Sequence, residues 1–100
     1  MIKHIIMWKL HDFAEGKSKA ENAKIMRERL FLLPEKIARM KNLEVGINIC
    51  QSPDAYDIVA CSEFDTIDDL QFYQKHAAHQ DFITSISGIR EKKKVVDYEI

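Results

Sequence analysis

The chain has few cysteines, no long apolar run and no excess of charge of one sign. Its 15 basic and 16 acidic side chains give a formal net charge of -1, so no overall attraction would draw it to nucleic acid or to an anionic membrane. Its apolar runs are far too short to span a bilayer, and its first residues lack the pattern of a signal peptide. The two cysteines, Cys50 and Cys61, do not make a disulfide framework. We therefore expect a cytoplasmic protein with reduced thiols and with neither nucleic acid nor membrane as a partner.

The length of 100 residues is that of one domain, which we expect to span residues 1–100. A chain of this length buries only roughly 60–65% of its unfolded surface, so its core is small. With 46% hydrophobic residues it should fold, and pairing with a second copy would add to the buried area.

Alternation of apolar and polar residues predicts four strands, over residues 2–10, 43–49, 56–64 and 95–100. In the first strand one face carries Ile2, His4, Ile6, Trp8 and Leu10, and the other face carries Lys3, Ile5, Met7 and Lys9. Residues 51–55 have the composition of a turn, so the second and third strands should form an antiparallel hairpin.

Helical spacing predicts a first main helix that begins with a capping box at Ser18 and Glu21. Its apolar stripe consists of Ala23, Met26, Leu30 and Leu33, and Ile37 and Met40 extend it. Pro34 lacks an amide hydrogen and clashes with the preceding turn, so it should break the helix and leave a short second helix near residues 34–39.

A second main helix should follow the third strand, with Thr66 as its N-cap. Its inward stripe is predicted to be Leu70, Tyr73 and Ala77. Another short helix should contain Phe82, Ile83 and Ile86, and Gly88 fits a helix stop.

The predicted element order is therefore β-α-β-β-α-β, which is the α+β, ferredoxin-like pattern of a four-stranded antiparallel sheet. Right-handed crossovers place both main helices on one face of that sheet. Several residues of the other face are apolar, namely Ile5, Met7, Val59, Cys61 and Val95. A lone monomer rarely exposes so much apolar surface, so we expect a twofold homodimer that packs sheet against sheet.

The groups best suited to chemistry gather in residues 73–82. His79 titrates near neutral pH and can take a proton, and the phenol of Tyr73 can donate a hydrogen bond to a developing enolate. The alternative interpretation is that Tyr73 packs in the core and His79 caps the segment through hydrogen bonds.

The remaining candidates have simpler explanations. His76 and His79 could lie on one helical face as a metal pair, but a metal site needs further ligands, which only His4 or Asp81 could supply. We therefore predict neither metal nor cofactor. Trp8 and Tyr98 either line a ligand cavity or fill the core, and the charge run at residues 91–94 is typical of a solvated segment before a strand.

Five segments in order resemble the stress-responsive α/β-barrel (Dabb) family over essentially the whole chain. They are residues 2–10, 43–46 and 56–64, the Tyr-x-x-His-x-x-His segment at residues 73–79, and residues 95–98. Ala77 departs from the pattern, because the family usually has proline there. The resemblance implies a homodimer in which two sheets form a barrel with the helices outside.

The resemblance implies less about function, since most members are uncharacterised. A plant member is a polyketide cyclase with a working histidine and tyrosine, which by motif correspond to His79 and Tyr73, with His4 lining the same cavity. Ile58 stands where that cyclase has a polar residue. We accordingly assign catalysis to His79 and Tyr73, and we assign ligand contacts to four residues, His4, Trp8, His76 and Phe82.

Three hypotheses follow. The first is a Dabb-like protein of undetermined role that binds a small, mostly apolar ligand between sheet and helices. The second is a cofactor-free polyketide cyclase- or monooxygenase-like enzyme, which requires an open cavity that reaches His79 rather than a space filled by Trp8, Phe82 and Leu70. The third is a metal-dependent protein with a cation among His4, His76 and His79.

Overall fold

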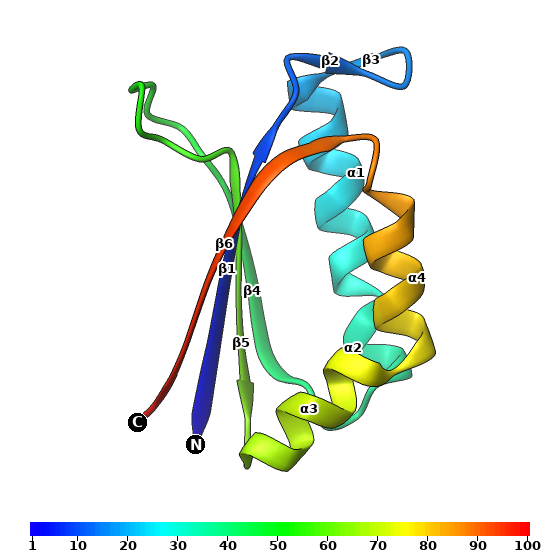
Figure 1. Ribbon diagram of the computed structural model, residues 1–100, viewed down its shortest axis with the longest axis vertical. Coiled ribbons are helices and arrows are strands. Elements are labelled where there is room, and N and C mark those ends of the chain that lie inside the picture. Colours follow the sequence, from blue (N-terminus) through cyan, green and yellow to red (C-terminus); the bar gives the residue numbers. More distant parts are fainter.

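A four-stranded antiparallel sheet forms one layer of the molecule, and the helices form a second layer on one of its faces (Figure 1). The computed structural model describes residues 1–100. In chain order the elements are β1 (Ile2–Leu10), β2 (Phe13–Ala14), β3 (Lys17–Ser18), α1 (Lys19–Phe31), α2 (Leu33–Lys36), β4 (Lys41–Ile47), β5 (Ile58–Phe64), α3 (Ile67–Lys75), α4 (Ala77–Ser85) and β6 (Arg90–Glu99). The strand order β4-β5-β1-β6 confirms the predicted ferredoxin-like fold.

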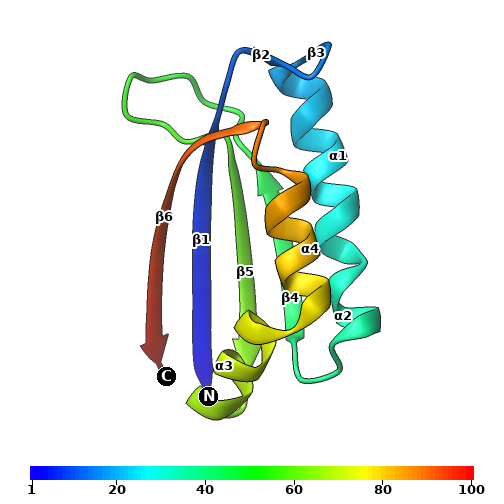
Figure 2. The same cartoon turned by 45° about the vertical axis from the view of Figure 1, so that its right-hand side comes forward.

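The central strand β1 pairs antiparallel with both β5 and β6. His4 lies opposite Ser62 on β5 and Asp97 on β6, so these three residues share the face that the helices cover. β6 is an edge strand that lies to one side of the helix layer (Figure 2). The helical face therefore remains less covered along β6 than along β1 and β5.

The strand boundaries of the hairpin differ from the prediction, because β4 begins at Lys41 rather than at residue 43 and β5 begins at Ile58 rather than at residue 56. β4 ends at Ile47, and Ile49 lies in the loop with 93% of its surface exposed. The side chain of Asn48 explains this, because its amide donates to the Cys50 carbonyl (2.7 Å) and its oxygen accepts from the Cys50 amide (3.3 Å). Such local bonds turn the chain out of the sheet although the apolar alternation continues.

β6 begins at Arg90, whereas the sequence predicted a start at residue 95. The charge run lies inside the strand, where Lys92, Lys93 and Lys94 pair with Lys9, Trp8 and Met7. The run is exposed, as its composition indicates, but backbone pairing with a long central strand draws it into the sheet.

A small hairpin of β2 and β3 was not predicted. Its two loop residues, Glu15 and Gly16, have φ values of 52° and 76°. Two successive positive φ values are the requirement of the tight turns that close such hairpins. The buried Asn22 side chain holds the hairpin by donating to the carbonyls of Ala14 (3.1 Å) and Lys17 (3.4 Å).

The helix termini largely follow the sequence signals. The Ser18–Glu21 capping box and the Thr66 N-cap are both present. Pro34 lies in the first turn of α2, which is shorter than predicted. The prediction was wrong for Ala77, which is exposed at the start of α4 because the chain breaks at His76. α4 ends with Ile86 as its C-cap, so Gly88 lies beyond the helix.

The core lies between the sheet and the helices. It contains 17 buried hydrophobic residues, with Phe64 and Met26 fully shielded from solvent. The only buried polar residues are His4, Asn22 and Ser62. His4 is thus a titratable group on the core side of the sheet.

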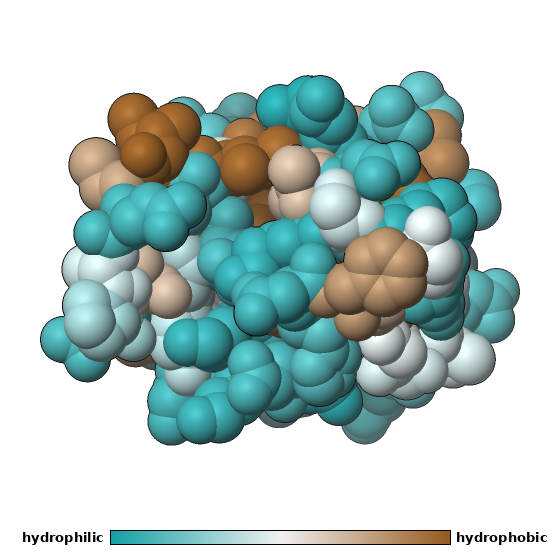
Figure 3. All heavy atoms as spheres, turned by 90° about the horizontal axis from the view of Figure 1, so that it is seen from above, coloured by the Kyte–Doolittle hydropathy of each residue, from teal (hydrophilic) through white to brown (hydrophobic).

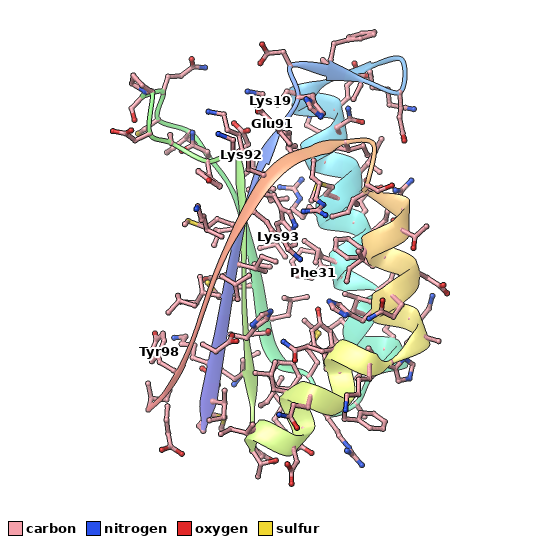
Figure 4. The ribbon with its side chains drawn as sticks, in the orientation of Figure 1. Lys19, Phe31, Glu91, Lys92, Lys93 and Tyr98 are labelled. Atoms are coloured by element: carbon pink, nitrogen blue, oxygen red, sulfur yellow. The ribbon has the colours of Figure 1, made fainter.

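The opposite face of the sheet, which we call the open face, has no covering layer within the chain (Figure 1). Val96 and Tyr98 are 53% and 41% exposed, and Figure 4 shows Tyr98 pointing away from the helices. The prediction was wrong for Val95, because Val95 pairs with Ile6 and therefore lies on the helical side. Val96 and Tyr98 take its place beside Ile5 on the open face.

The end of the molecule that bears the β2–β3 hairpin and the β4–β5 loop is mostly hydrophilic, with separate apolar patches (Figure 3). None of the helices has the length and apolar character that a membrane crossing needs. Cys50 and Cys61 are both free thiols.

The capping box gives a direct test of the local structure. Ser18→Ala removes the acceptor of the Glu21 amide (3.2 Å) and should lower the free energy of unfolding by about 1 kcal/mol. Ser18→Asp keeps an acceptor and should retain stability close to that of the wild type. Urea unfolding at one fixed protein concentration measures both variants, and equal losses in both would contradict a capping role.

Candidate functional site

A cavity of about 90 Å³ lies between β1, β6 and the two helices α3 and α4. The strands contribute His4, Trp8 and Lys93 to its lining, and the helices contribute Tyr73, His79 and Phe82. Five of the six residues that the sequence assigned to the site therefore meet here. The cavity stays open rather than being filled by Trp8, Phe82 and Leu70.

His4 is held in one orientation by its neighbour on β6. Its side chain is buried, with 6% of the residue exposed, and Nδ1 bonds the Oδ1 atom of Asp97. Because a carboxylate can only accept, we assign the Nδ1 proton to this bond. Nε2 makes no hydrogen bond within the chain, and no fully shielded polar side-chain atom lacks a partner. Nε2 of His4 is therefore accessible from the cavity.

Tyr73 and His79 are brought together by a break in the helix. In one continuous helix, residues six apart would lie about 120° apart around the axis. His76 ends α3 and caps α4, accepting a hydrogen bond from the Ala78 amide at Nδ1 (3.0 Å). The turn returns His79 to Tyr73, and their ring centroids lie 4.3 Å apart.

The Nε2 lone pair of His79 faces the cavity. Its Nδ1–H donates to the carbonyl of Gln74 (3.1 Å), which leaves Nε2 without a partner in the chain. Burial lowers the pKa of His79 below its ordinary value, the Gln74 bond opposes this, and electrostatic interaction with His4 and Lys93 lowers it further. The imidazole is consequently neutral at pH 7 and able to accept a proton.

Tyr73 supplies the opposite function. Burial raises the pKa of its phenol well above the ordinary value, so the hydroxyl stays protonated. The residue is 4% exposed, and its hydroxyl makes no hydrogen bond within the chain. Since every fully shielded polar side-chain atom has a partner, this hydroxyl also faces the cavity.

The alternative interpretation, in which Tyr73 packs in the core and His79 bonds the backbone, describes one part of each side chain. The ring of Tyr73 packs against Phe64, with centroids 5.2 Å apart, and also lies 6.2 Å from the ring of His4. His79 does bond a backbone carbonyl at the end of α3. These structural contacts use the Tyr73 ring and His79 Nδ1, and they leave the Tyr73 hydroxyl and His79 Nε2 free for a ligand.

The other candidate residues differ in whether they line the cavity. Trp8 and Phe82 line the cavity and meet edge to face, with centroids 6.0 Å apart. His76 lies outside the lining and contacts the ring of Phe72 instead. Tyr98 lies on the open face. The metal alternative finds no support in the geometry, because no group of three or more His, Cys, Asp or Glu side chains is arranged to hold a metal ion.

Sequence reasoning missed Asp97 and Lys93. Asp97 shares a strand face with Val95, so the sequence placed it on the open face, and only the register of β6 against β1 shows that it meets His4. Lys93 belongs to an exposed charge run, and no sequence signal identifies which of its lysines lies on the helical side of the sheet.

Residues 2–100 match the family described as Stress responsive A/B Barrel Domain, Dabb. The chain belongs to the Dabb family. This confirms the resemblance found in the sequence. A comparison with curated proteins gave no match.

Solved structures agree with this assignment. A dimeric Bacteroides fragilis protein of unknown function and ferredoxin-like fold is 32% identical, with a TM-score of 0.85 over 99% of this chain and 95% of that chain. A dimeric ferredoxin-like protein from Thermobifida fusca is 21% identical, with a TM-score of 0.83 over 99% and 90%. A hydroxynitrile lyase from Passiflora edulis is 16% identical, with a TM-score of 0.82 over 99% and 92%. The last two likenesses show the fold alone.

The lowered pKa of His79 predicts a pH dependence of stability. Below the ordinary pKa of 6.5 the unfolded chain binds more protons than the folded chain, so the free energy of unfolding rises with pH there. The contribution of His79 should be fully present above pH 6.5 and be lost as the pH falls through the lowered pKa. Urea midpoints across this range should show a smaller slope in His79→Gln than in the wild type.

The exposed His11 supplies the control, because His11→Gln should keep the wild-type slope. The ring signals of His79 in NMR spectra give an independent readout of its titration. A midpoint at or above 6.5 would show that burial does not govern this imidazole.

Proposed function

We propose that this Dabb protein is a homodimer whose cavity binds a small carbonyl compound and transfers a proton at the carbon next to the carbonyl. His79 is the base, Tyr73 is the hydrogen-bond donor, and His4 assists. One observation carries the proposal: Nε2 of His79 and the hydroxyl of Tyr73 both lack partners in the chain and face the same cavity.

The protonation states suit such a reaction. A neutral His79 takes a proton from the α-carbon and becomes an imidazolium, while the electron pair of the broken C–H bond forms the enolate. The phenol of Tyr73 donates a hydrogen bond to the enolate oxygen and stays protonated. The imidazolium then returns the proton to carbon, or to a leaving group in a lyase or cyclase reaction.

His4 adds a second imidazole whose orientation Asp97 fixes. The bond from Nδ1 directs Nε2 toward the cavity, where its lone pair can accept a proton. His4 can therefore hold or pass on the proton that His79 removes. Its ring centroid lies 6.2 Å from that of Tyr73.

The size of the cavity favours a small ligand. A cavity needs roughly 10–15 Å³ to hold one water molecule, and each water occupies about 30 Å³ in the liquid, so this cavity holds about three. A long polyketide chain exceeds this space unless the helices move apart. The Passiflora edulis relative supports only the statement that this fold is compatible with lyase chemistry. The polyketide cyclase and monooxygenase alternatives use the same pair of residues but need a wider opening.

Proton exchange tests the proposal without knowledge of the natural substrate. In D2O the wild type should accelerate loss of the methyl-proton NMR signals of pyruvate or acetone over a buffer blank. His79→Ala and Tyr73→Phe should each lower the rate about 100-fold, as expected for loss of a general base or an enolate donor. His11→Ala should leave the rate unchanged.

Light scattering and circular dichroism establish that each variant remains folded and dimeric. The proposal fails if the wild type accelerates exchange of neither ketone. It also fails if His79→Ala exchanges as fast as the wild type.

The open face supports the dimer. Large apolar side chains on it are exposed in the isolated chain, among them Met7, Val96 and Tyr98. Two relatives with this fold are described as dimeric, one of them 32% identical. Packing two such faces across a twofold axis would bury these side chains and close a barrel of two sheets with the helices outside.

Val59 provides the test of this interface. It pairs with Met7 and Gly46 near the middle of the open face. Val59→Asp would bury an unpaired carboxylate in each protomer, at several kcal/mol per ion, and should yield a monomer or an aggregate. Leu32→Asp changes an exposed apolar residue on the helical side and should leave the dimer intact. A dimer mass by light scattering for Val59→Asp would show that the interface lies elsewhere.

A further inference from the structure

We infer that the ligand carries a carboxylate, and that Lys93 and Arg90 bind it at the mouth of the cavity. The inference rests on the proposed function, because it concerns the same cavity and names the class of compound that enters it: a small oxo acid. The two cations would hold the anionic end, while Tyr73 and His79 act at the carbonyl end.

A β-bulge places both cations on the same side. Lys92 pairs with Lys9 and Arg90 pairs with Leu10, so Glu91 is an extra residue in β6. Side chains alternate along a regular strand, and residues three apart would point to opposite faces. The extra residue reverses the alternation, and Arg90 and Lys93 both line the cavity. Bulges beside functional sites often redirect a side chain in this way.

The lining of the cavity has positive charge without an acidic counterpart. No aspartate or glutamate is among its residues, whereas Lys93 and Arg90 are. Neither cation takes part in an ion pair; the pairs in the chain involve Lys19, Arg39, Lys41 and His4. Asp97, which faces the same side of β6 as Lys93, already bonds His4. A bound anion would balance a charge that the protein leaves unbalanced.

The positions of the two cations fit one end of a short molecule. Lys93 pairs with Trp8, and Figure 4 shows its side chain pointing from β6 toward the helices. Its charge reaches His79, whose pKa it lowers in addition to the larger effect of burial. The planar guanidinium of Arg90 can donate two parallel hydrogen bonds to a carboxylate. The small volume leaves room for few atoms between this end and the Tyr73 hydroxyl.

The experiment compares an acid with its neutral ester. Pyruvate and methyl pyruvate share the ketone and the methyl group, differ in charge, and are short enough to suit the small cavity. Titrations followed by the ring NMR signals of His4 and His79 give the Kd of each. The acid should bind about tenfold more tightly than the ester, the factor that one charge-assisted hydrogen bond supplies.

Substitutions assign the preference to the two cations. Lys93→Met and Arg90→Met each keep an aliphatic chain and should bring the ratio of the two Kd values close to one. Lys92→Met removes the same charge from the adjacent residue, which pairs with Lys9 on the other face, and should keep the tenfold ratio. Added salt should weaken the binding of the acid and leave the binding of the ester unchanged.

Each other outcome overturns the inference. Equal affinities for acid and ester would mean that the cavity binds ligands, as the proposed function requires, but does not select an anion. If Lys92→Met loses the preference for the acid as fully as Lys93→Met does, the preference comes from general surface charge and not from the cavity. If neither pyruvate nor methyl pyruvate binds, small oxo acids are ruled out as ligands, while proton exchange from acetone would still decide the proposed function.

Discussion

The register between β1 and β6 determines most of what distinguishes this molecule. It places His4 opposite Asp97, Trp8 opposite Lys93 and Ile5 opposite Val96. A shift of one residue would exchange the two faces of β6 and separate every one of these pairs. The buried histidine, the cation at the cavity mouth and the apolar open face all depend on the same set of backbone hydrogen bonds.

The second determinant is the short interruption between α3 and α4. His76 ends one helix and begins the next, and its imidazole uses Nδ1 for the Ala78 amide. His76, which was assigned to ligand contact from the sequence, therefore bonds the backbone instead. The chemistry remains with Tyr73 and His79, which the interruption brings into contact although they are six residues apart. Ala77, where the family usually has proline, occupies the first position of α4 and is compatible with this turn.

Local patterns were sufficient to predict the fold. Alternation identified β1, and the faces assigned to it are those observed, with His4 and Trp8 buried on the core side. Capping residues located the starts of α1 and α3. Strand ends were less predictable, because Asn48 diverts the chain through bonds that a search for alternation does not detect, and because pairing draws a lysine run into β6.

The candidate site was predicted in part. His4, Trp8, Tyr73, His79 and Phe82 do meet around one cavity, since each lies on the inner side of an element whose period the sequence shows. Asp97, Lys93 and Arg90 could not be assigned, because their positions depend on the pairing of two strands some 90 residues apart in the chain and on a single bulge residue. The register between two strands that are distant in the chain cannot be derived from a single sequence.

The two faces of the sheet are used separately, and this has a consequence for stoichiometry. The residues around His79 lie on the helical side of the sheet, whereas the proposed partner would occupy the opposite side. In a dimer formed through the open face, the two cavities would lie back to back with both sheets between them. Each subunit would then fill independently, with one ligand per chain and no cooperativity that requires a shared residue.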